Sequence, residues 1–257
     1  MAVANGAVMI ITGSAAGIGR ELAEVAASNG ARVVVNSRKH ERMATVVGHI
    51  KERGGEVLGV AADVRKEEEV DRLVEETLAR FGRVDVLVNN AAGLFFSPAE
   101  RITPNGWRSV VDVNLNAPFL CARAVMPHMR EQGGGEILNI SSIAAFRPHP
   151  YGAHYAAAKA GLNSLTETLA YEWARYGIRV NAVALGPVVT ESSRFANEEN
   201  RREAERHIPA GRIAGAFEVA ETLWAILNTS SSYLTGDVIR LDGCFRGVLE
   251  PPAEVGA

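Results

Sequence analysis

Short apolar segments alternate with helical segments along almost the whole chain. Segments that are apolar throughout are typical of strands in a sheet covered on both faces, and a helix between two strands allows them to pair in parallel. The pattern therefore predicts an α/β fold with a doubly wound parallel sheet of about seven strands, flanked by helices on both faces. We expect strands at residues 8–12, 32–36, 56–61, 84–89, 136–140, 179–184 and 237–241.

The segments between these strands have helical patterns. Thr103 and Pro104 suit the N-cap and first position of one helix. No segment resembles a linker, so residues 1–257 are predicted to form one domain, with a substrate lid at about 190–215 and a C-terminal tail at 244–257. The charged run at 198–203 is expected to be a solvated helix face. Helices are expected from the first glycine-rich turn to about residue 29 and at 39–53, 66–81, 104 to about 130, 154–175 and 217–227, with an irregular stretch at about 185–215.

Composition narrows the possible functions. The chain has 27 Lys and Arg against 30 Asp and Glu, a net charge of −3, so no basic field favours nucleic acid or an anionic membrane. Two cysteines are too few for a disulfide framework, and no Cys and His spacing is typical of zinc. The N-terminal apolar run is too short for a signal peptide or membrane helix. We expect a cytoplasmic protein with no metal and no nucleic-acid or membrane partner.

A tyrosine and a lysine four positions apart suggest proton transfer. Tyr155 and Lys159 would lie on one face of a helix, with Ser142 upstream. A free tyrosine titrates near ~10, and a nearby ammonium group lowers that pKa towards the range of an acid–base catalyst. The alternatives are a buried structural tyrosine beside a solvated lysine, with Ser142 as a cap.

Glycines are concentrated in the first strand-to-helix turn, which reads Thr-Gly-Ser-Ala-Ala-Gly-Ile-Gly at residues 12–19. Glycine lets the backbone turn sharply and approach a ligand, and a helix N-terminus offers free N–H groups to a pyrophosphate. The spacing differs from the commonest dinucleotide fingerprint, and any tight turn could use three glycines. Its place after the first strand favours a cofactor role.

The end of the second strand lacks the acidic residue that usually binds the adenosine ribose in a dinucleotide fold. Instead, Ser37 can hydrogen-bond an oxygen and Arg38 can pair with a 2′-phosphate. The alternative is that Arg38 and Lys39 only open a solvated helix. These residues favour NADP(H) over NAD(H) as cofactor.

Further motifs occur in an order that resembles the short-chain dehydrogenase/reductase family. The resemblance covers residues 12 to about 243 and implies a single-domain Rossmann fold that binds a nicotinamide dinucleotide. Besides the glycine loop, it is carried by Asp63-Val64, Asn89-Asn90-Ala91, Asn114, Ser142, Tyr155, Lys159, Asn181 and Gly186-Pro187-Val188-Val189-Thr190.

The resemblance also implies roles for individual residues. Tyr155 would be the general acid/base, Lys159 would lower its pKa and hold the nicotinamide ribose, and Ser142 would hydrogen-bond the substrate oxygen. Asn114 would anchor a water that leads from Lys159 to solvent. Tyr155 and Lys159 would also contact the cofactor, together with Gly13, Ser14, Ala16, Gly17, Ile18, Gly19, Ser37, Arg38, Asp63, Val64, Asn90, Ala91, Gly186, Val188 and Thr190.

Three positions depart from the family pattern. The usual Asn-Asn-Ala-Gly is here Asn-Asn-Ala-Ala-Gly, which adds Ala92 to the cofactor wall and resembles the 2,4-dienoyl-CoA reductase branch. That branch characteristically lacks a tyrosine where this chain has Tyr155, so the tyrosine favours carbonyl chemistry over C=C reduction. Leu185 and Cys244 replace a usual proline and a usual glycine.

These observations predict an NADPH-preferring oxidoreductase that acts on a ketone or its secondary alcohol. The alternatives are an enoyl- or dienoyl-thioester reductase and a non-catalytic NADP-sensing protein. Substrate loops are expected at residues 94–96 and 146–151, where Arg147 and His149 could hold a substrate or lie on the surface. Family members commonly pair their two long helices, which implies a homotetramer or a homodimer.

Overall fold

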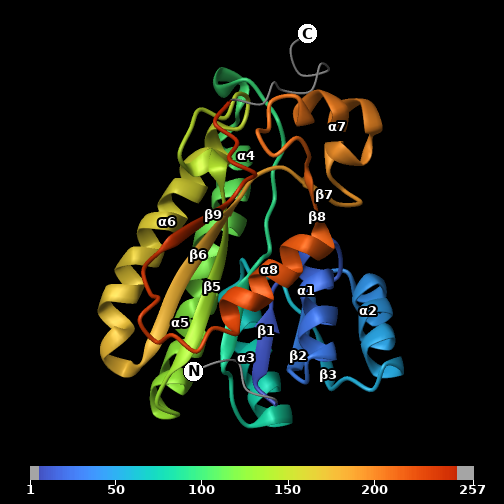
Figure 1. Ribbon diagram of the computed structural model, residues 1–257. Coiled ribbons are helices and arrows are strands. Elements are labelled where there is room, and N and C mark those ends of the chain that lie inside the picture. Colours follow the sequence, from blue (N-terminus) through green and yellow to red (C-terminus); the bar gives the residue numbers. More distant parts are fainter. Residues whose placement is uncertain (1–5, 248–257) are drawn as a thin grey trace.

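The computed structural model describes residues 6–247, and seven parallel strands form its central sheet in the order β3-β2-β1-β4-β5-β6-β9 (Figure 1). The order runs outward from β1 in one direction and from β4 in the other, so the predicted doubly wound sheet is confirmed. The carboxyl ends of β1 and β4 therefore border the crevice where such sheets bind ligands. The strands are β1 Val8–Ile11, β2 Arg32–Ser37, β3 Val57–Ala61, β4 Val86–Asn89, β5 Gly135–Ser142, β6 Ile178–Leu185 and β9 Val238–Leu241.

Helices cover both faces of the sheet (Figure 1). One hydrophobic cluster packs α1, α2 and α8 against one face, and a second packs α3, α5 and α6 against the other. Successive strand residues alternate between them, so Met9 and Ile11 join the first cluster and Ile10 the second. The helices are α1 Gly17–Ser28, α2 His40–Glu52, α3 Glu67–Phe81, α4 Pro104–Val111, α5 Ala117–Glu131, α6 Ala153–Trp173, α7 Glu198–Glu205 and α8 Ala216–Leu227.

The predicted helix from Pro104 to about residue 130 is interrupted. A π-helical turn, Asp112–Asn116, separates α4 from α5. Pro118 has no N–H to continue the α-helical ladder to the backbone oxygen of Asn114, which favours a break at this point. The predicted cap is confirmed, because the Thr103 hydroxyl accepts a hydrogen bond from the Gly106 N–H at 3.1 Å.

The stretch predicted to be irregular contains short elements. β7 Val188–Val189 pairs in parallel with β8 Ala214–Gly215, and α7 lies between them in sequence. A small apolar cluster that includes Phe195, Ile208 and Phe245 supports this region. The charged run at residues 198–203 is a solvated helix face, as predicted. Its last residue, Glu203, pairs with Arg206 just beyond α7 at 2.9 Å, and both side chains are mostly exposed.

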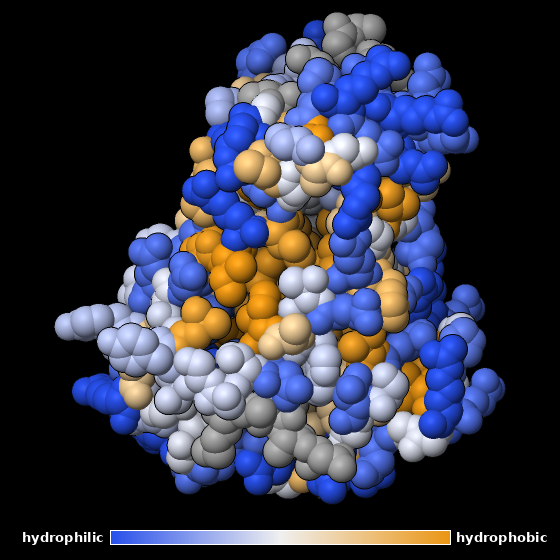
Figure 2. All heavy atoms as spheres, in the orientation of Figure 1, coloured by the Kyte–Doolittle hydropathy of each residue, from blue (hydrophilic) through white to orange (hydrophobic). Residues whose placement is uncertain are grey.

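Figure 2 shows apolar side chains around a hollow on one face of the molecule, with the hydrophilic side chains of α7 above it. Within residues 6–247, no helix combines the length and the apolar character needed to cross a bilayer. Residues 1–5 of the predicted domain and residues 248–257 of the predicted tail lie outside the described part of the chain.

Candidate active site

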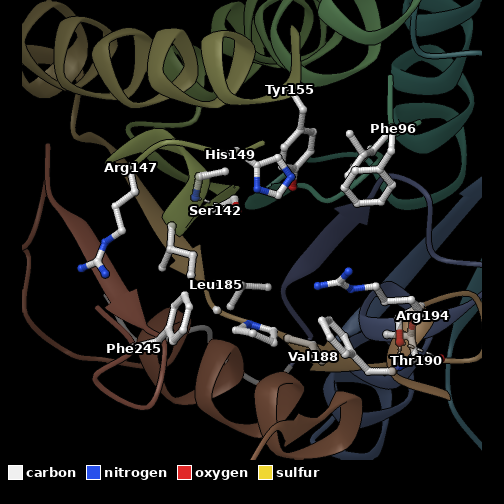
Figure 3. A pocket seen from close by; sticks show the side chains of 18 of the residues that line it. Phe96, Ser142, Arg147, His149, Tyr155, Leu185, Val188, Thr190, Arg194 and Phe245 are labelled. Carbon is white, nitrogen blue, oxygen red and sulfur yellow. Dashed lines mark hydrogen bonds between the residues drawn. The ribbon is translucent and has the colours of Figure 1, made fainter. Parts of the chain in front are cut away.

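Ser142 and Tyr155 meet at the carboxyl edge of the sheet. Ser142 is the last residue of β5, and Tyr155 lies in the first turn of α6. Burial raises the pKa of Tyr155, and a hydrogen bond with Ser142 opposes that rise. Figure 3 shows both side chains, together with His149, on one wall of a cleft. The His149 and Tyr155 ring centres are 5.8 Å apart.

Lys159 lies one helical turn beyond Tyr155 and is buried. Its Nζ donates a hydrogen bond to the backbone oxygen of Ile140 at 2.7 Å and lies 5.6 Å from the centre of the Tyr155 ring. Burial lowers the pKa of Lys159 to about 7. The sequence predicted that the lysine would lower the pKa of Tyr155, whereas that pKa is raised. The reason is that burial disfavours the charged form of both groups.

Asn114 lies in the π-helical turn and is buried. Its Nδ2 donates to the backbone oxygens of Gly93 at 2.6 Å and Val110 at 2.9 Å. Its Oδ1 is also buried, and no described residue donates a hydrogen bond to it. Buried oxygens of this kind commonly accept from an ordered water.

The glycine loop is pressed against the turn that follows β4. A Cβ on Gly13 would lie 2.8 Å from the Cα of Ala91, and a Cβ on Gly19 would lie 2.4 Å from the Nδ2 of Asn90. The Asn90 Nδ2 donates to the backbone oxygens of Thr12 at 2.9 Å and Gly13 at 3.2 Å. These contacts fix the loop and explain why glycine is needed at both positions.

Two predicted cofactor residues turn their side chains into the protein. The Ser14 hydroxyl donates to the Ile11 backbone oxygen at 2.6 Å and accepts from the Asn36 N–H at 3.0 Å. The Val64 side chain belongs to the hydrophobic cluster beneath α3 and α5. Only the backbone of Ser14 and Val64 can therefore face a cofactor.

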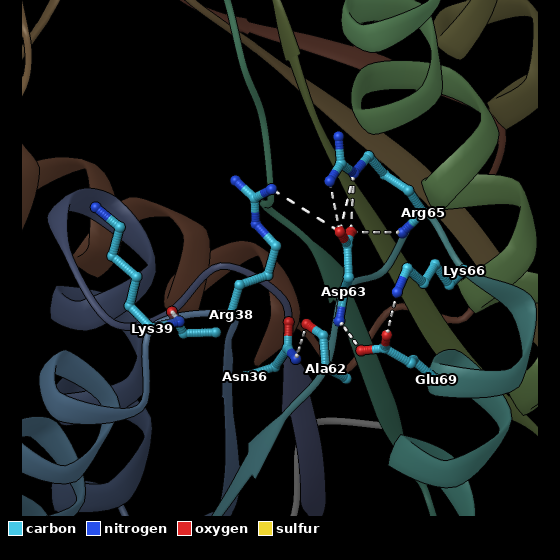
Figure 4. Close-up of polar contacts among 9 residues, drawn as sticks. Asn36, Arg38, Lys39, Ala62, Asp63, Arg65, Lys66 and Glu69 are labelled. Atoms are coloured by element: carbon cyan, nitrogen blue, oxygen red, sulfur yellow. Dashed lines mark hydrogen bonds and ion pairs between the residues drawn. The ribbon is translucent and has the colours of Figure 1, made fainter.

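Charged side chains gather where β2 and β3 end (Figure 4). Arg65 donates hydrogen bonds to both carboxylate oxygens of Asp63, from Nη2 to Oδ2 at 2.5 Å and from Nε to Oδ1 at 2.9 Å. This hydrogen bonding lowers the pKa of Asp63 to about 2. Arg38 reaches the same carboxylate only at 3.8 Å, and its side chain is 64% exposed. The Ser37 hydroxyl accepts from the Lys39 N–H at 3.0 Å. Arg65 holds Asp63 firmly, whereas Arg38 is held loosely.

A carboxylate occupies the N-terminus of α1. Glu191 Oε2 accepts a hydrogen bond from the Gly17 N–H at 3.2 Å, and Oε1 pairs with Arg20 at 2.5 Å. The neighbouring Thr190 also approaches the loop, since its Cγ2 lies 3.4 Å from where a Gly17 Cβ would be. An anion is thus bound where the helix end favours one.

The cleft beside Tyr155 has a volume of about 580 Å³, within the range of small-molecule sites. It brings Ser142 and Tyr155 together with Gly186, Val188 and Thr190, which come from the segment after β6. The other residues predicted to bind the cofactor do not line this cleft. They lie at the N-terminus of α1 and at the ends of β2, β3 and β4. These residues are Gly13, Ala16, Gly17, Ile18, Gly19, Ser37, Arg38, Asp63, Asn90 and Ala91.

Sequence reasoning missed Arg65 and Glu191. A signal existed for Arg65, because an arginine two residues after Asp63 in a turn can reach the carboxylate. None existed for Glu191, whose hydrogen-bond partner is 174 residues away. Among residues 6–247, no group of three or more His, Cys, Asp and Glu side chains is arranged to hold a metal.

A family model described as "short chain dehydrogenase" matches residues 7–201. This chain belongs to the short-chain dehydrogenase family. The match includes the glycine loop, Asn114, Ser142, Tyr155 and Lys159. Membership implies a nicotinamide cofactor, and the chain fits one, because the loop permits close backbone approach and the α1 N-terminus already holds a carboxylate.

Individual short-chain dehydrogenases and related enzymes match over nearly the full chain. The chain is 38% identical to a probable 2,4-dienoyl-CoA reductase, (2E)-enoyl-CoA-producing, of Bacillus subtilis, over 91% of this chain and 94% of that protein. It is 40% identical to 3beta-hydroxysteroid dehydrogenase 1 of Eggerthella lenta, over 93% of each. A crystal structure of a short chain dehydrogenase from Bacillus anthracis superposes with a TM-score of 0.85 at 37% identity, covering 92% of this chain and 95% of that one.

Proposed function

We propose that this chain is an NADP(H)-preferring oxidoreductase that interconverts a ketone and its secondary alcohol. The observation that supports this most directly is the placement of Ser142 and Tyr155 on one wall of the cleft. Two hydroxyl groups on one wall can both reach a single substrate oxygen. The nearby Lys159 adds an amine that can exchange a proton.

The bound nicotinamide would supply or accept the hydride. The N–H groups at the start of α1 would hold its pyrophosphate, and Val188 and Thr190 would orient the nicotinamide. Lys159 would hold the nicotinamide ribose through the amine that now donates to Ile140. Near the adenine, the carboxylate of Asp63 and the backbone of Val64 are available.

Proton transfer is assigned to this chain's own side chains. In the reducing direction, Ser142 would donate a hydrogen bond to the carbonyl oxygen, and Tyr155 would transfer its phenolic proton to that oxygen. A raised tyrosine pKa keeps the phenol protonated at neutral pH, as an acid must be. Lys159 would return a proton to Tyr155, and a water at the Asn114 Oδ1 would connect the lysine to solvent.

The preference for NADP(H) rests on Arg38. Its guanidinium is mostly exposed and loosely held, so it can pair with a 2′-phosphate at little cost. The end of β2 carries Ser37 instead of an acidic residue, and the nearby Asp63 carboxylate is already paired with Arg65.

A second candidate is a reductase of enoyl or dienoyl thioesters. The Bacillus subtilis relative has such a name, and Ala92, the residue that departs from the family pattern, lines the cleft. This function would depend only weakly on the phenol of Tyr155 as a donor to oxygen, because reduction of a C=C bond places both the hydride and the proton on carbon.

The proposal is tested by following NADPH and NADH oxidation by absorbance with four substrate classes: ketones, β-ketoacyl thioesters, quinones and enoyl thioesters. Reduction of a carbonyl substrate with NADPH preferred is the expected result. Reduction of enoyl thioesters alone would favour the second candidate. Tight cofactor binding without turnover of any class would favour a sensing role.

We also propose a homotetramer, or a homodimer, paired through α5 and α6. Phe119 on α5 and Tyr171 on α6 are exposed, the latter by 90%, and small residues in α6 permit close helix contact. Light scattering at micromolar concentration should give a multiple of 27.5 kDa, and a mass of one chain would contradict this proposal.

A further inference from the structure

The cleft beside Tyr155 contains cationic side chains and lacks anionic ones. Arg147 and Arg194 line it, and none of its described lining residues is Asp or Glu. Figure 3 shows Arg147 at one end of the cleft and Arg194 at the other, with Tyr155 between them. A cleft lined by one sign of charge concentrates ligands of the opposite sign.

The two arginines differ in how they are held. Arg194 lies near Thr190 in Figure 3, in the part of the cleft assigned to the cofactor, and its Cζ stacks 5.1 Å over the Phe195 ring. Arg147 lines the cleft, and its Nη1 is shielded from solvent with no described residue accepting a hydrogen bond from it. Its positive charge is therefore left without a hydrogen-bonded partner at Nη1, so an anion that approaches the part of the guanidinium facing the cleft would be stabilising.

The walls around Tyr155 are largely apolar. Phe96, Leu185 and Phe245 line the cleft, which suits a hydrocarbon segment of a ligand. His149 adds a polar group, but burial and the neighbouring Arg194 hold its pKa below the usual value. The histidine is therefore neutral at pH 7, and Arg147 supplies the positive charge at its end of the cleft.

We propose that Arg147 binds an anionic group of the substrate, remote from the carbonyl that Tyr155 protonates. This inference rests on the proposed function and names its substrate class: an amphipathic ketone, or the corresponding alcohol, with a carboxylate or phosphate group. Arginine suits both anions, because its planar guanidinium donates two parallel hydrogen bonds to either one.

A binding experiment tests the anion site without any turnover. Isothermal titration calorimetry compares octanoate with octanamide, with and without NADP⁺. We expect octanoate to bind at least about fivefold tighter. Arg147→Gln should bring the two affinities together, and Arg147→Lys should retain part of the difference. Arg240→Gln is the matched control, because this exposed arginine stacks on Phe146 beside Arg147 and is not among the cleft-lining residues.

A kinetic experiment identifies the source of the anion. Methyl ketones with a terminal carboxylate are compared with their amides, and coenzyme A thioesters with N-acetylcysteamine thioesters of the same acyl group. A higher kcat/KM for the anionic member of either pair, lost in Arg147→Gln, supports the proposal and shows whether a carboxylate or a phosphate is bound.

Two results would overturn the inference. One is equal affinity of the wild-type protein for octanoate and octanamide, and the other is an octanoate preference that Arg147→Gln leaves unchanged. Failure of the proposed function would look different: octanoate would bind through Arg147, but no ketone in the kinetic experiment would be reduced.

Discussion

The Nζ of Lys159 lies 2.7 Å from the backbone oxygen of Ile140 and 5.6 Å from the centre of the Tyr155 ring. The helix α6 thus holds a buried amine beneath the phenol. Burial lowers the pKa of this amine to about 7, from an ordinary value of 10.5. A buried lysine is unfavourable for folding, so its presence here indicates a function that outweighs the loss of stability.

Replacing Lys159 with methionine should therefore stabilise the fold. The pKa of Lys159 is about 7 in the folded chain and about 10.5 in the unfolded chain, so the unfolded chain binds the proton more tightly. Burying this lysine therefore destabilises the fold fully below pH 7, less as the pH rises, and not at all above about pH 10.5. We expect Lys159→Met to raise the free energy of unfolding by about 2 kcal/mol at pH 6.5, after the loss of the Ile140 hydrogen bond. The difference should shrink by pH 10.

Urea denaturation at pH 6.5 and pH 10 measures this effect. Lys51→Met is the matched control, because Lys51 is exposed on α2 and should show no comparable pH dependence. A Lys159→Met variant that is less stable at pH 6.5, or whose advantage grows with pH, would contradict the interpretation.

Replacing Arg38 with aspartate should shift cofactor preference towards NADH. The change removes the proposed partner of the 2′-phosphate and adds an acceptor for the ribose hydroxyls. We expect the ratio of kcat/KM for NADPH to that for NADH to fall by about 100-fold. Arg42→Asp, the same charge change at an exposed position of α2, should leave the ratio nearly unchanged. An unaltered ratio in Arg38→Asp would mean that the phosphate is recognised elsewhere.

Replacing Glu191 with glutamine should strengthen cofactor binding. The carboxylate accepts from the Gly17 N–H and pairs with Arg20, so it would compete with and repel a pyrophosphate at the α1 N-terminus. Fluorescence titration at low salt should show a Kd for NADPH lower by about threefold to tenfold. The effect should weaken at high salt. Glu199→Gln, on exposed α7, is the control, and weaker binding in Glu191→Gln would refute the competition.

The sheet could be predicted from the sequence because its strands are apolar throughout and helices separate them. The chemistry-bearing segments were also predictable, since they lie at strand ends or on one helix face. The π-helical turn at Asn114 and the pairing of β7 with β8 were not, because they depend on packing and leave no periodic pattern. The pKa of Tyr155 was predicted in the wrong direction, because spacing along a helix does not reveal how deeply both groups are buried.

Partners distant in sequence explain the other differences. The carboxylate of Glu191 reaches the glycine loop only because the segment after β6 folds over the α1 N-terminus. The side chains of Ser14 and Val64 face the interior because the local backbone turns them towards Ile11 and the α3 cluster. Motif positions therefore indicated a candidate cofactor site but could not show which side chains face it.

The rate of ketone reduction by Tyr155→Phe with NADPH shows most directly whether Tyr155 is the proton donor. Removing one hydroxyl should lower kcat/KM by about 10³-fold, because the substrate oxygen loses its proton donor, and should change the Kd for NADPH by less than about threefold. Tyr233→Phe, the same change at a 97% exposed position outside the cleft and outside α5 and α6, should behave as wild type. Ketone reduction by Tyr155→Phe within about tenfold of the wild-type rate would contradict the assignment of Tyr155 as the acid.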